Sequence, residues 1–370
     1  MEQLINEVST KINLDIGVIG RLDVKKYNSI LVLTGPKNSL EVFHQKVEPH
    51  LKKGKYVVYS QISANPTDSE VYHITNFARE KNIDCIISVG GGSVMDCGRL
   101  VSLLLSHSGF LHDYVLGGSL GANGITSELI PHITVPTVCG TGAEISAVSA
   151  VTMAGCKQRV YSPYLVPRAA YIDPELMTGI PVKLWSSIGF ECFAAAIEAY
   201  TSSLSNPASD GFAQAALKAY MATMPKILKQ PDKPEHIKQM VIASLNASMA
   251  VGMSSLGAIH AIGEALSGRL SLHTGMALAI VAPFVCEFNY SANKEKYDSL
   301  KEFLGCTKQK NIKAAVGEII RNTGVFIPQI KDKIEANLDA IVADSMNYML
   351  MGNAKPVTNE DVANILKSIS

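Results

Sequence analysis

Residues 85–96 read Cys-Ile-Ile-Ser-Val-Gly-Gly-Gly-Ser-Val-Met-Asp, and this stretch decides the fold of the chain. Its apolar beginning has the composition of a strand that is buried on both faces. The glycines at 90–92 then permit a tight turn, and Ser93 is a suitable N-cap for a helix over 94–106. Amide groups at such a helix start favour a phosphate, although three glycines alone are equally compatible with a turn that binds nothing. The stretch does not match the GxGxxG dinucleotide fingerprint.

Strands and helices alternate upstream of this stretch. They are predicted, in turn, at residues 29–33, 37–51, 56–59 and 68–82. This rhythm indicates a parallel sheet, and ligands of such sheets bind at the carboxyl ends of the strands. The loops at Gly35, Asn65 and residue 90 are therefore expected to share one edge of the sheet.

A second glycine-rich loop, Pro-Thr-Val-Cys-Gly-Thr-Gly-Ala-Glu at 136–144, follows a predicted strand at 133–135. Its threonine hydroxyls and flexible backbone suit hydrogen bonds to a cofactor, but the loop alone is equally compatible with a structural turn. From residue 181 onward, alanine, leucine and methionine recur at helical spacing. We therefore predict an α/β nucleotide-binding domain at 1–180 and an all-helical domain at 181–370, whose last helix is capped by Thr358.

Composition excludes several classes of partner. The 370 residues carry a formal net charge of +0 with 18% charged residues, so no basic field indicates nucleic acid or an anionic membrane. Seven cysteines without a CxxC pair argue against a disulfide framework or a zinc ribbon. The N-terminus is acidic, and no segment offers about 18 uninterrupted apolar residues for a membrane span. A cytoplasmic protein with a small-molecule partner is expected.

The second half of the chain contains candidate metal ligands. Glu191 and Glu198 lie seven residues apart, which places them on one helix face. His260 and Glu264 form an i, i+4 pair, and His273 follows 13 residues after His260. Two imidazoles with one carboxylate suit zinc or ferrous iron and leave a position for a substrate oxygen. Each histidine taken alone is more often a core or surface residue.

Several motifs in chain order resemble those of the iron-containing, group III alcohol dehydrogenases, which are similar in fold to dehydroquinate synthase. The matching segments are Asn65-Pro66-Thr67, Gly90-Gly91-Gly92-Ser93 with Asp96, Pro136-Thr137, Gly140-Thr141-Gly142-Ala143-Glu144, Ile172-Asp173-Pro174-Glu175-Leu176, Ala196-Ile197-Glu198-Ala199-Tyr200 and 353–361. The resemblance implies a nucleotide-binding α/β domain, an all-helical C-terminal domain, and a nicotinamide above a divalent metal.

The chain departs from this family at the metal site. The dehydrogenases bind metal through an aspartate and, four residues later, a histidine, where this chain has Glu191 and Ala195. A further family histidine, often assigned to proton relay or substrate contact, is replaced by Glu264, and the last ligand is His273, one residue earlier than usual. The resemblance thus implies Glu191, His260 and His273 as ligands of one iron or zinc ion. With the family's relay histidine absent, Glu264 beside His260 is the local candidate for acid–base catalysis, and we take these two as the catalytic residues. A carboxyl in an apolar pocket can have a pKa suited to acid–base work.

The cofactor is assigned to ten positions. They are Gly35, Asn65, Gly90, Gly91, Gly92, Ser93, Asp96, Thr137, Val138 and Thr141. NAD-preferring members commonly place an aspartate after the first strand, where this chain has Gly35, so NADP is preferred over NAD, with Lys37 nearby. Arg99 stands where the family commonly has lysine, one turn below the glycine loop.

We therefore expect an NAD(P)-dependent alcohol dehydrogenase or aldehyde reductase that acts as a homodimer. Hydride would pass between nicotinamide and a small alcohol or aldehyde whose oxygen is polarised by the metal. Two alternatives stay open. One is a lyase of the dehydroquinate-synthase kind that cyclises a phosphorylated sugar acid, and the other is a metal-free nucleotide-binding relative with a degenerate site.

Overall fold

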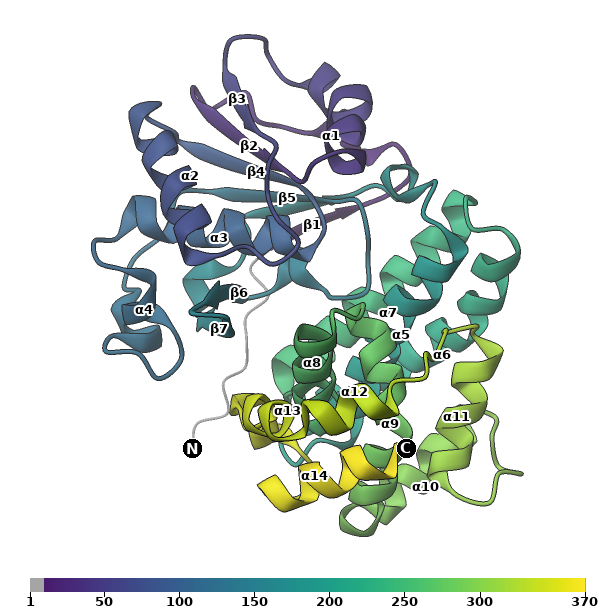
Figure 1. Cartoon of the computed structure of the whole chain (residues 1–370). Helices are drawn as coiled ribbons and strands as arrows, with labels where there is room; N and C mark the ends of the chain where they lie inside the picture. The colour runs from purple at the N-terminus through teal and green to yellow at the C-terminus, as the bar shows by residue number, and fades with distance from the viewer. Residues whose placement is uncertain (1–9, 370) are drawn as a thin grey trace. The chain divides into compact units, whose positions relative to one another are not determined.

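The computed structural model describes residues 10–369 (Figure 1). The described chain divides after Thr178 into an α/β unit at 10–178 and a helical unit at 179–369. This confirms the predicted fold class, an α/β unit followed by an all-helical one. The sequence places the domain boundary two residues later, at 180/181.

The α/β unit is built on a six-stranded sheet in the order β1-β8-β5-β4-β2-β3. All neighbouring strands in this sheet are parallel. The strands are β1 Lys11–Leu14, β2 Ile30–Thr34, β3 Tyr56–Tyr59, β4 Cys85–Gly90, β5 His132–Pro136 and β8 Ala169–Ile172. Each residue of β2, β4, β5 and β8 is buried, which explains their continuous apolar runs. A separate antiparallel hairpin pairs β6 Val148–Met153 with β7 Cys156–Tyr161.

Both faces of the sheet are covered by apolar side chains. Leu31 and Leu33 of β2 pack in the same cluster as Leu100. The alternate residues Ile30 and Val32 pack in a second cluster. This division follows from the two-residue period of a strand. The longer helices of the unit are α2 Asp68–Glu80 and α3 Gly92–Ser106, and the shorter ones are α1 Asn38–Val42 and α4 Leu111–Tyr114.

Two of the predicted helices differ from the observed ones. The helix predicted at 37–51 changes pitch, from α1 to a wide turn at Phe43–Val47 and a tight turn at Glu48–His50. Pro49 in that last turn has no amide hydrogen to continue an α-helix. The prediction that Ser93 is an N-cap is wrong, because α3 begins at Gly92 and its N-cap is Gly91.

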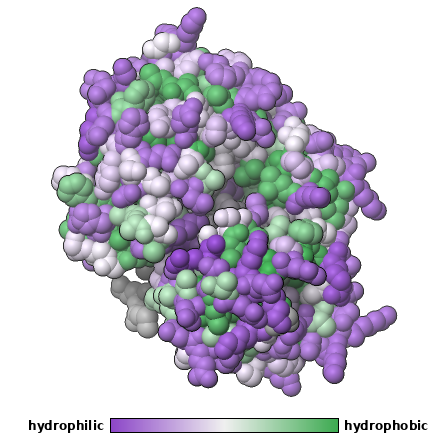
Figure 2. All heavy atoms as spheres, in the orientation of Figure 1, coloured by the Kyte–Doolittle hydropathy of each residue, from purple (hydrophilic) through white to green (hydrophobic). Residues whose placement is uncertain are grey.

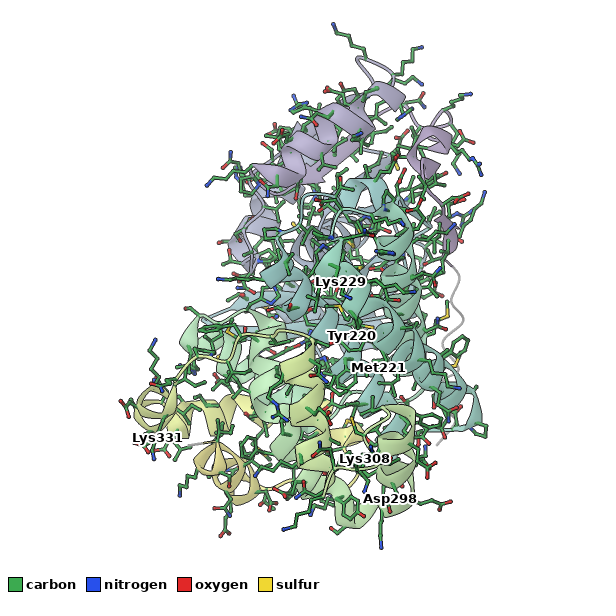
Figure 3. All side chains as sticks on the ribbon, turned by 90° about the vertical axis from the view of Figure 1, so that its right-hand side faces the viewer. Tyr220, Met221, Lys229, Asp298, Lys308 and Lys331 are labelled. Atoms are coloured by element: carbon green, nitrogen blue, oxygen red, sulfur yellow. The ribbon has the colours of Figure 1, made fainter. Side chains whose placement is uncertain are left out.

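The helical unit contains ten α-helices among its described residues. They are α5 Val182–Thr201, α6 Pro207–Lys229, α7 Pro234–Met253, α8 Ala258–Leu270, α9 Thr274–Asn289, α10 Lys294–Phe303, α11 Ile312–Asn322, α12 Lys331–Ala336, α13 Leu338–Ser345 and α14 Asn359–Ser368. Tyr220 of α6, labelled in Figure 3, packs its ring 4.9 Å from that of Phe193 on α5. Thr358 caps α14 as predicted, because its hydroxyl accepts the Asp361 amide at 3.1 Å.

Helix α9 with its extension, Thr274–Ala292, is the one single helix among the described residues with the length and hydropathy of a membrane span. However, 61% of its most apolar window is buried inside the fold, and Glu287 interrupts it. It therefore has the character of a core helix. Figure 2 shows a molecular face that is mostly hydrophilic and carries scattered apolar patches.

Candidate active site

The loops that follow the parallel strands meet in the α/β unit, as predicted. The Ile62 amide donates to the Thr34 carbonyl at 3.4 Å, which joins the loops after β3 and β2. The Thr137 amide donates to the Gly90 carbonyl at 3.0 Å, which joins the loops after β5 and β4. The Ser93 hydroxyl donates to the Ala64 carbonyl beside Asn65. We call this region, residues 34–35, 62–67, 90–93 and 137–143, the loop edge.

The two glycine loops of the loop edge are in close contact. A Cβ at Gly91 would lie 3.2 Å from Cγ2 of Val138, and one at Gly92 would lie 3.6 Å from Oγ1 of Thr141. A side chain at either position would enter the space where the loops approach each other. The pair thus forms a cradle in which Gly91 and Gly92 present backbone without a side chain, which suits the close approach of a pyrophosphate.

The start of α3 supplies the electrostatic attraction for such an anion. Gly91 is its N-cap and has no side chain to bind the amides of the first turn. The Val94 and Met95 amides donate to the Gly91 carbonyl at 3.1 and 3.2 Å. The amides of residues 92 and 93 precede this turn, at the positive end of the helix dipole. The residues therefore fit a dinucleotide phosphate.

Asp96, which was predicted to contact the cofactor, has its partner inside the unit. Its Oδ1 accepts a hydrogen bond from Nη2 of Arg99 at 2.7 Å, and its side chain is 19% exposed. The Arg99 side chain is only 1% exposed. Asp96 therefore serves first as the counter-charge of a buried arginine.

In the helical unit, Glu198 of α5 holds His260 of α8. Oε2 of Glu198 lies 2.5 Å from Nδ1 of His260. The other oxygen, Oε1, accepts the backbone amides of Ile259 at 2.5 Å and His260 at 3.3 Å. One carboxylate therefore caps the helix and orients the imidazole, and it leaves Nε2 as the ring nitrogen for other partners.

Glu191 pairs with the other predicted histidine. Its Oε1 lies 3.5 Å from Nδ1 of His273 and accepts the Gly275 amide at 3.0 Å. A Cβ at Gly275 would lie 1.8 Å from the carbonyl oxygen of Ser187, so only glycine lets α9 approach α5 this closely. Between α8 and α9 the chain turns at Ser271, which has the left-handed φ of 53°.

The carboxylates also act on the two imidazoles electrostatically. Burial lowers the pKa of His260, but the charge and hydrogen bond of Glu198, with contributions from Glu264 and Glu191, raise it overall. Burial lowers the pKa of His273. We call Glu191, Glu198, His260, Glu264 and His273 the Glu/His set.

The predicted metal site of Glu191, His260 and His273 is not assembled. Within residues 10–369, no three His, Cys, Asp or Glu side chains lie close enough together to hold a metal ion. Glu191 Oε1 lies 3.5 Å from Nδ1 of His273, and Glu198 binds Nδ1 of His260, which leaves Nε2 of that ring open. Ala195 has no donor atom. These residues therefore do not fit the metal site that the family resemblance implies.

Sequence reasoning missed two residues that position this set. Glu198 was placed on the right helix face but was given no role. Asn353 Oδ1 accepts the Ala258 amide at 3.2 Å and the Asn289 side-chain amide at 2.8 Å, so it also caps α8. Glu198 and Asn353 both lie in segments that match the family, at 196–200 and 353–361, but neither segment indicated which atoms the two side chains would bind.

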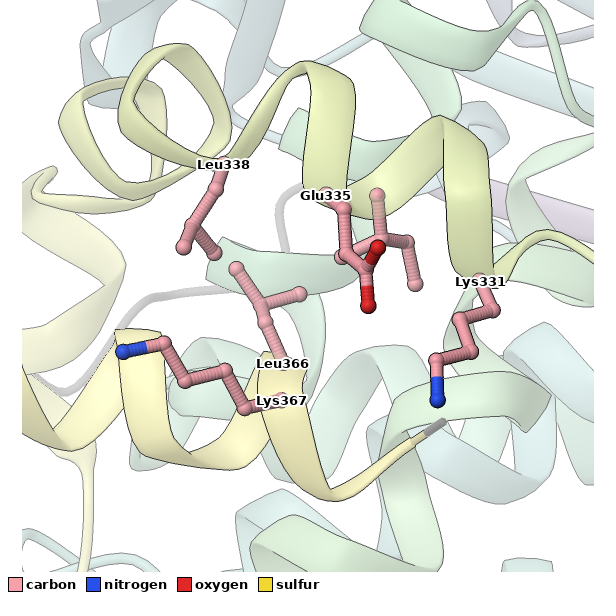
Figure 4. A pocket seen from close by; sticks show the side chains of 6 residues that line it. Lys331, Glu335, Leu338, Leu366 and Lys367 are labelled. Atoms are coloured by element: carbon pink, nitrogen blue, oxygen red, sulfur yellow. The ribbon is translucent and has the colours of Figure 1, made fainter.

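One pocket of the helical unit lies at α12, α13 and α14 (Figure 4). It is lined by Lys331, Ile334, Glu335, Leu338, Leu366 and Lys367. None of the predicted site residues lines it. The pocket is therefore distinct from the Glu/His set.

Comparisons with known proteins agree with the two-unit fold. The family model described as iron-containing alcohol dehydrogenase matches residues 14–174, and the C-terminal model of the Fe-containing alcohol dehydrogenase family matches residues 187–370. The chain is 28% identical over 301 residues to the NAD-dependent methanol dehydrogenase of Bacillus methanolicus, with 78% of each chain covered. It is 31% identical over 264 residues to the 1,3-propanediol dehydrogenase of Citrobacter freundii, with 70% of this chain and 67% of that protein covered.

A solved structure gives the same result. The alcohol dehydrogenase from Oenococcus oeni superposes with a TM-score of 0.87 at 25% identity, over 97% of this chain and 98% of that chain. Both units of the chain are thus matched, in sequence and in fold. The chain belongs to the iron-containing alcohol dehydrogenase family and is an NAD(P)-dependent oxidoreductase that acts on CH–OH groups.

Proposed function

We propose that the chain interconverts a small alcohol and its aldehyde, with NADP as the preferred dinucleotide. The observation that carries this proposal is the loop edge, where two glycine loops meet and a Cβ at Gly91 would come within 3.2 Å of Val138. When bound, the nicotinamide supplies or accepts the hydride. The relatives named above are dehydrogenases of methanol and 1,3-propanediol, which supports a small alcohol or aldehyde as substrate.

The loop edge would hold the dinucleotide through backbone and hydroxyl groups. The amides at Gly92 and Ser93 would bind the pyrophosphate, and the hydroxyls of Thr137 and Thr141 would donate further hydrogen bonds. A side chain at Gly35 would meet only ordinary contacts, the nearest at 3.7 Å from Oγ of Ser39. Without a carboxylate at this position, a 2′-phosphate meets no like charge, which supports the preference for NADP.

The proton of the reaction is assigned to the Glu/His set. Because the residues do not fit the family's metal site, the substrate oxygen would exchange its proton with Nε2 of His260 or with Glu264. Glu198 would keep the proton on Nδ1 of His260 and fix the ring. Glu264 lies one helical turn from His260 and contributes to its electrostatic environment.

We further propose that the protein is a cytoplasmic homodimer. A neutral formal charge and the mostly hydrophilic face in Figure 2 suit a protein that works without a membrane or nucleic acid. Light scattering on the purified chain would measure its mass. A monomeric mass across a tenfold dilution series would contradict the dimer.

A turnover screen tests the function. Purified protein is mixed with NADP or NAD and a panel of alcohols, or with the reduced dinucleotides and aldehydes, and NAD(P)H absorbance is followed. A net change is expected for short substrates, whereas a cyclase of the dehydroquinate-synthase kind would give none. We expect activity to survive exhaustive chelation, and loss of activity that added iron or zinc restores would contradict the assigned proton step.

A further inference from the structure

Arg99 is the largest charged side chain that is fully buried in the α/β unit, and it contacts three separate segments. Its Nη2 donates to Asp96 on the same helix at 2.7 Å. Its Nη1 donates to the carbonyl of Ala143 in the second glycine loop at 2.6 Å. Its Nε donates to the hydroxyl of Ser149 on β6 at 2.8 Å. The guanidinium thus joins the helix that begins at the first glycine loop to the second glycine loop.

The segment at Ala143 is one of the parts of the second loop that face the first. A Cβ at Gly92 would lie 3.8 Å from Cβ of Ala143 and 3.6 Å from Oγ1 of Thr141. The next carbonyl, that of Glu144, accepts the hydroxyl of Thr134 at 3.0 Å. Two successive carbonyls of the second loop therefore accept hydrogen bonds from outside it, Ala143 from Arg99 and Glu144 from Thr134 on β5. The spacing between the two loops depends on both bonds.

A lysine at this position could not make the same contacts. A guanidinium is planar and presents donors on several edges at once, so it can bind acceptors that lie in different directions. An ammonium is a compact point charge, and the Asp96 carboxylate would be its strongest partner. The Ala143 carbonyl and the Ser149 hydroxyl would then lose a charged donor. The presence of arginine instead of the family's common lysine thus has a structural consequence.

We propose that Arg99 is a positioning residue for the dinucleotide, which it does not touch itself. It sets the second glycine loop at the distance from Gly91 and Gly92 that a bound pyrophosphate requires. This inference rests on the proposed function, because it assumes that the dinucleotide binds at the loop edge. It assigns to the buried Asp96–Arg99 pair a role in affinity that is separate from its role in stability.

The test compares Arg99→Lys with Leu100→Ala, a buried substitution at the next residue of α3 that touches neither loop through a hydrogen bond. Dinucleotide Kd is measured by titration calorimetry, Tm by calorimetric unfolding, and KM and kcat by turnover. Arg99→Lys is expected to raise Kd and KM for the dinucleotide about tenfold with kcat changed much less. Leu100→Ala is expected to lower Tm at least as much as Arg99→Lys does and to leave the dinucleotide Kd unchanged.

Ser149→Ala gives a second, milder variant, because it removes the acceptor of Nε and the weak bond of the Ser149 hydroxyl to the Asp96 carbonyl but leaves both Nη bonds of Arg99 in place. It is expected to raise Kd in the same direction by a smaller factor. A wild-type Kd for the dinucleotide in both Arg99→Lys and Ser149→Ala would overturn the role of Arg99 and leave the proposed function intact. A wild-type chain that binds neither NADP nor NAD would overturn the proposed function and the inference together. A Kd that rises equally in Leu100→Ala would show that Arg99 acts only through stability.

Discussion

The loop edge of the α/β unit and the Glu/His set of the helical unit are built from different chemical groups. The loop edge consists of backbone amides, glycines and short hydroxyl side chains at the ends of parallel strands. The Glu/His set consists of carboxylate and imidazole side chains, and the carboxylates of Glu198 and Glu191 already have partners on neighbouring helices. The chemistry of the loop edge depends on the path of the backbone, whereas that of the Glu/His set depends on the identity of its side chains.

This difference determines how each region responds to substitution. A backbone-built region tolerates changes around it until a Cβ or a charge enters the space that the backbone lines. A region built from side chains loses its chemistry with a single replacement, although the helices that carry it stay folded. The four predictions below, ordered by expected effect, are ways to test this contrast.

His260→Ala should have the largest effect. Removal of a general acid–base group typically costs about a thousandfold in kcat. Dinucleotide Kd should change far less than kcat, because the contacts proposed for the dinucleotide are those of the loop edge. Steady-state turnover and calorimetric titration measure the two quantities. His273→Ala serves as the matched control, and an equal loss of kcat in both variants would argue against the special role of His260.

Glu144→Gln tests the one buried carboxylate beside the loop edge. Burial raises the pKa of Glu144 to about 7, opposed by a backbone hydrogen bond and by the charge of Arg99. Because the folded state then binds the proton more tightly than the unfolded state, the stability contribution of this group falls as pH rises from 4.5, the ordinary pKa of a glutamate, towards 7.

The loss over that range corresponds to about 3 kcal/mol of unfolding free energy. Glu144→Gln removes this titration, so its stability relative to wild type should improve steadily across the same window. Urea unfolding at closely spaced pH values measures it. A difference between the two proteins that is constant with pH would show that Glu144 titrates normally.

Gly91→Val places a side chain in the backbone-lined cradle. We expect dinucleotide Kd to rise about a hundredfold while the far-UV circular dichroism spectrum stays native. The double variant Gly91→Val with Val138→Ala removes the nearest side chain, which a Cβ at 91 would approach to 3.2 Å. If the double variant regains wild-type affinity, the loss came from loop displacement and not from contact with the dinucleotide.

Gly35→Asp should have the smallest effect and tests the preference for NADP. A carboxylate after β2 would repel a 2′-phosphate, so kcat/KM for NADP should fall about tenfold with little change for NAD. Gly35→Asn, which has the same size without the charge, is the matched control. A wild-type chain that strongly prefers NAD would contradict the preference itself.

The loop edge could be predicted from the sequence because its geometry follows from local rules. Strands with continuous apolar runs, separated by helices, form parallel sheets, and the loops after β2, β4 and β5 must then meet. The predicted strand at 56–59 coincides with β3. The Ser93 N-cap was wrong because the glycine triplet enters the helix, an extension that capping preference alone does not reveal.

The arrangement of the Glu/His set could not be predicted to the same degree. Helical periodicity placed Glu191 and Glu198 on one face of α5, but not which histidine each would meet. That choice depends on how α8 and α9 approach α5, and Gly275 controls the approach through a tertiary contact. Glu198, and not Glu191, binds His260 because the amides of Ile259 and His260 hold its carboxylate at the start of α8.

The contact of Gly275 with Ser187 also has an evolutionary consequence. It anchors the first turn of α9, so an insertion or deletion between His260 and His273 has to be absorbed before that turn. The α8–α9 connection already bends at Ser271, which has a φ of 53°, and a residue can be gained or lost at this bend. A gain of one residue there would restore the spacing common in the family without shifting α9. The α8–α9 connection is therefore a site where descendants of this chain could gain or lose ligand geometry through a change in length instead of a change in residue type.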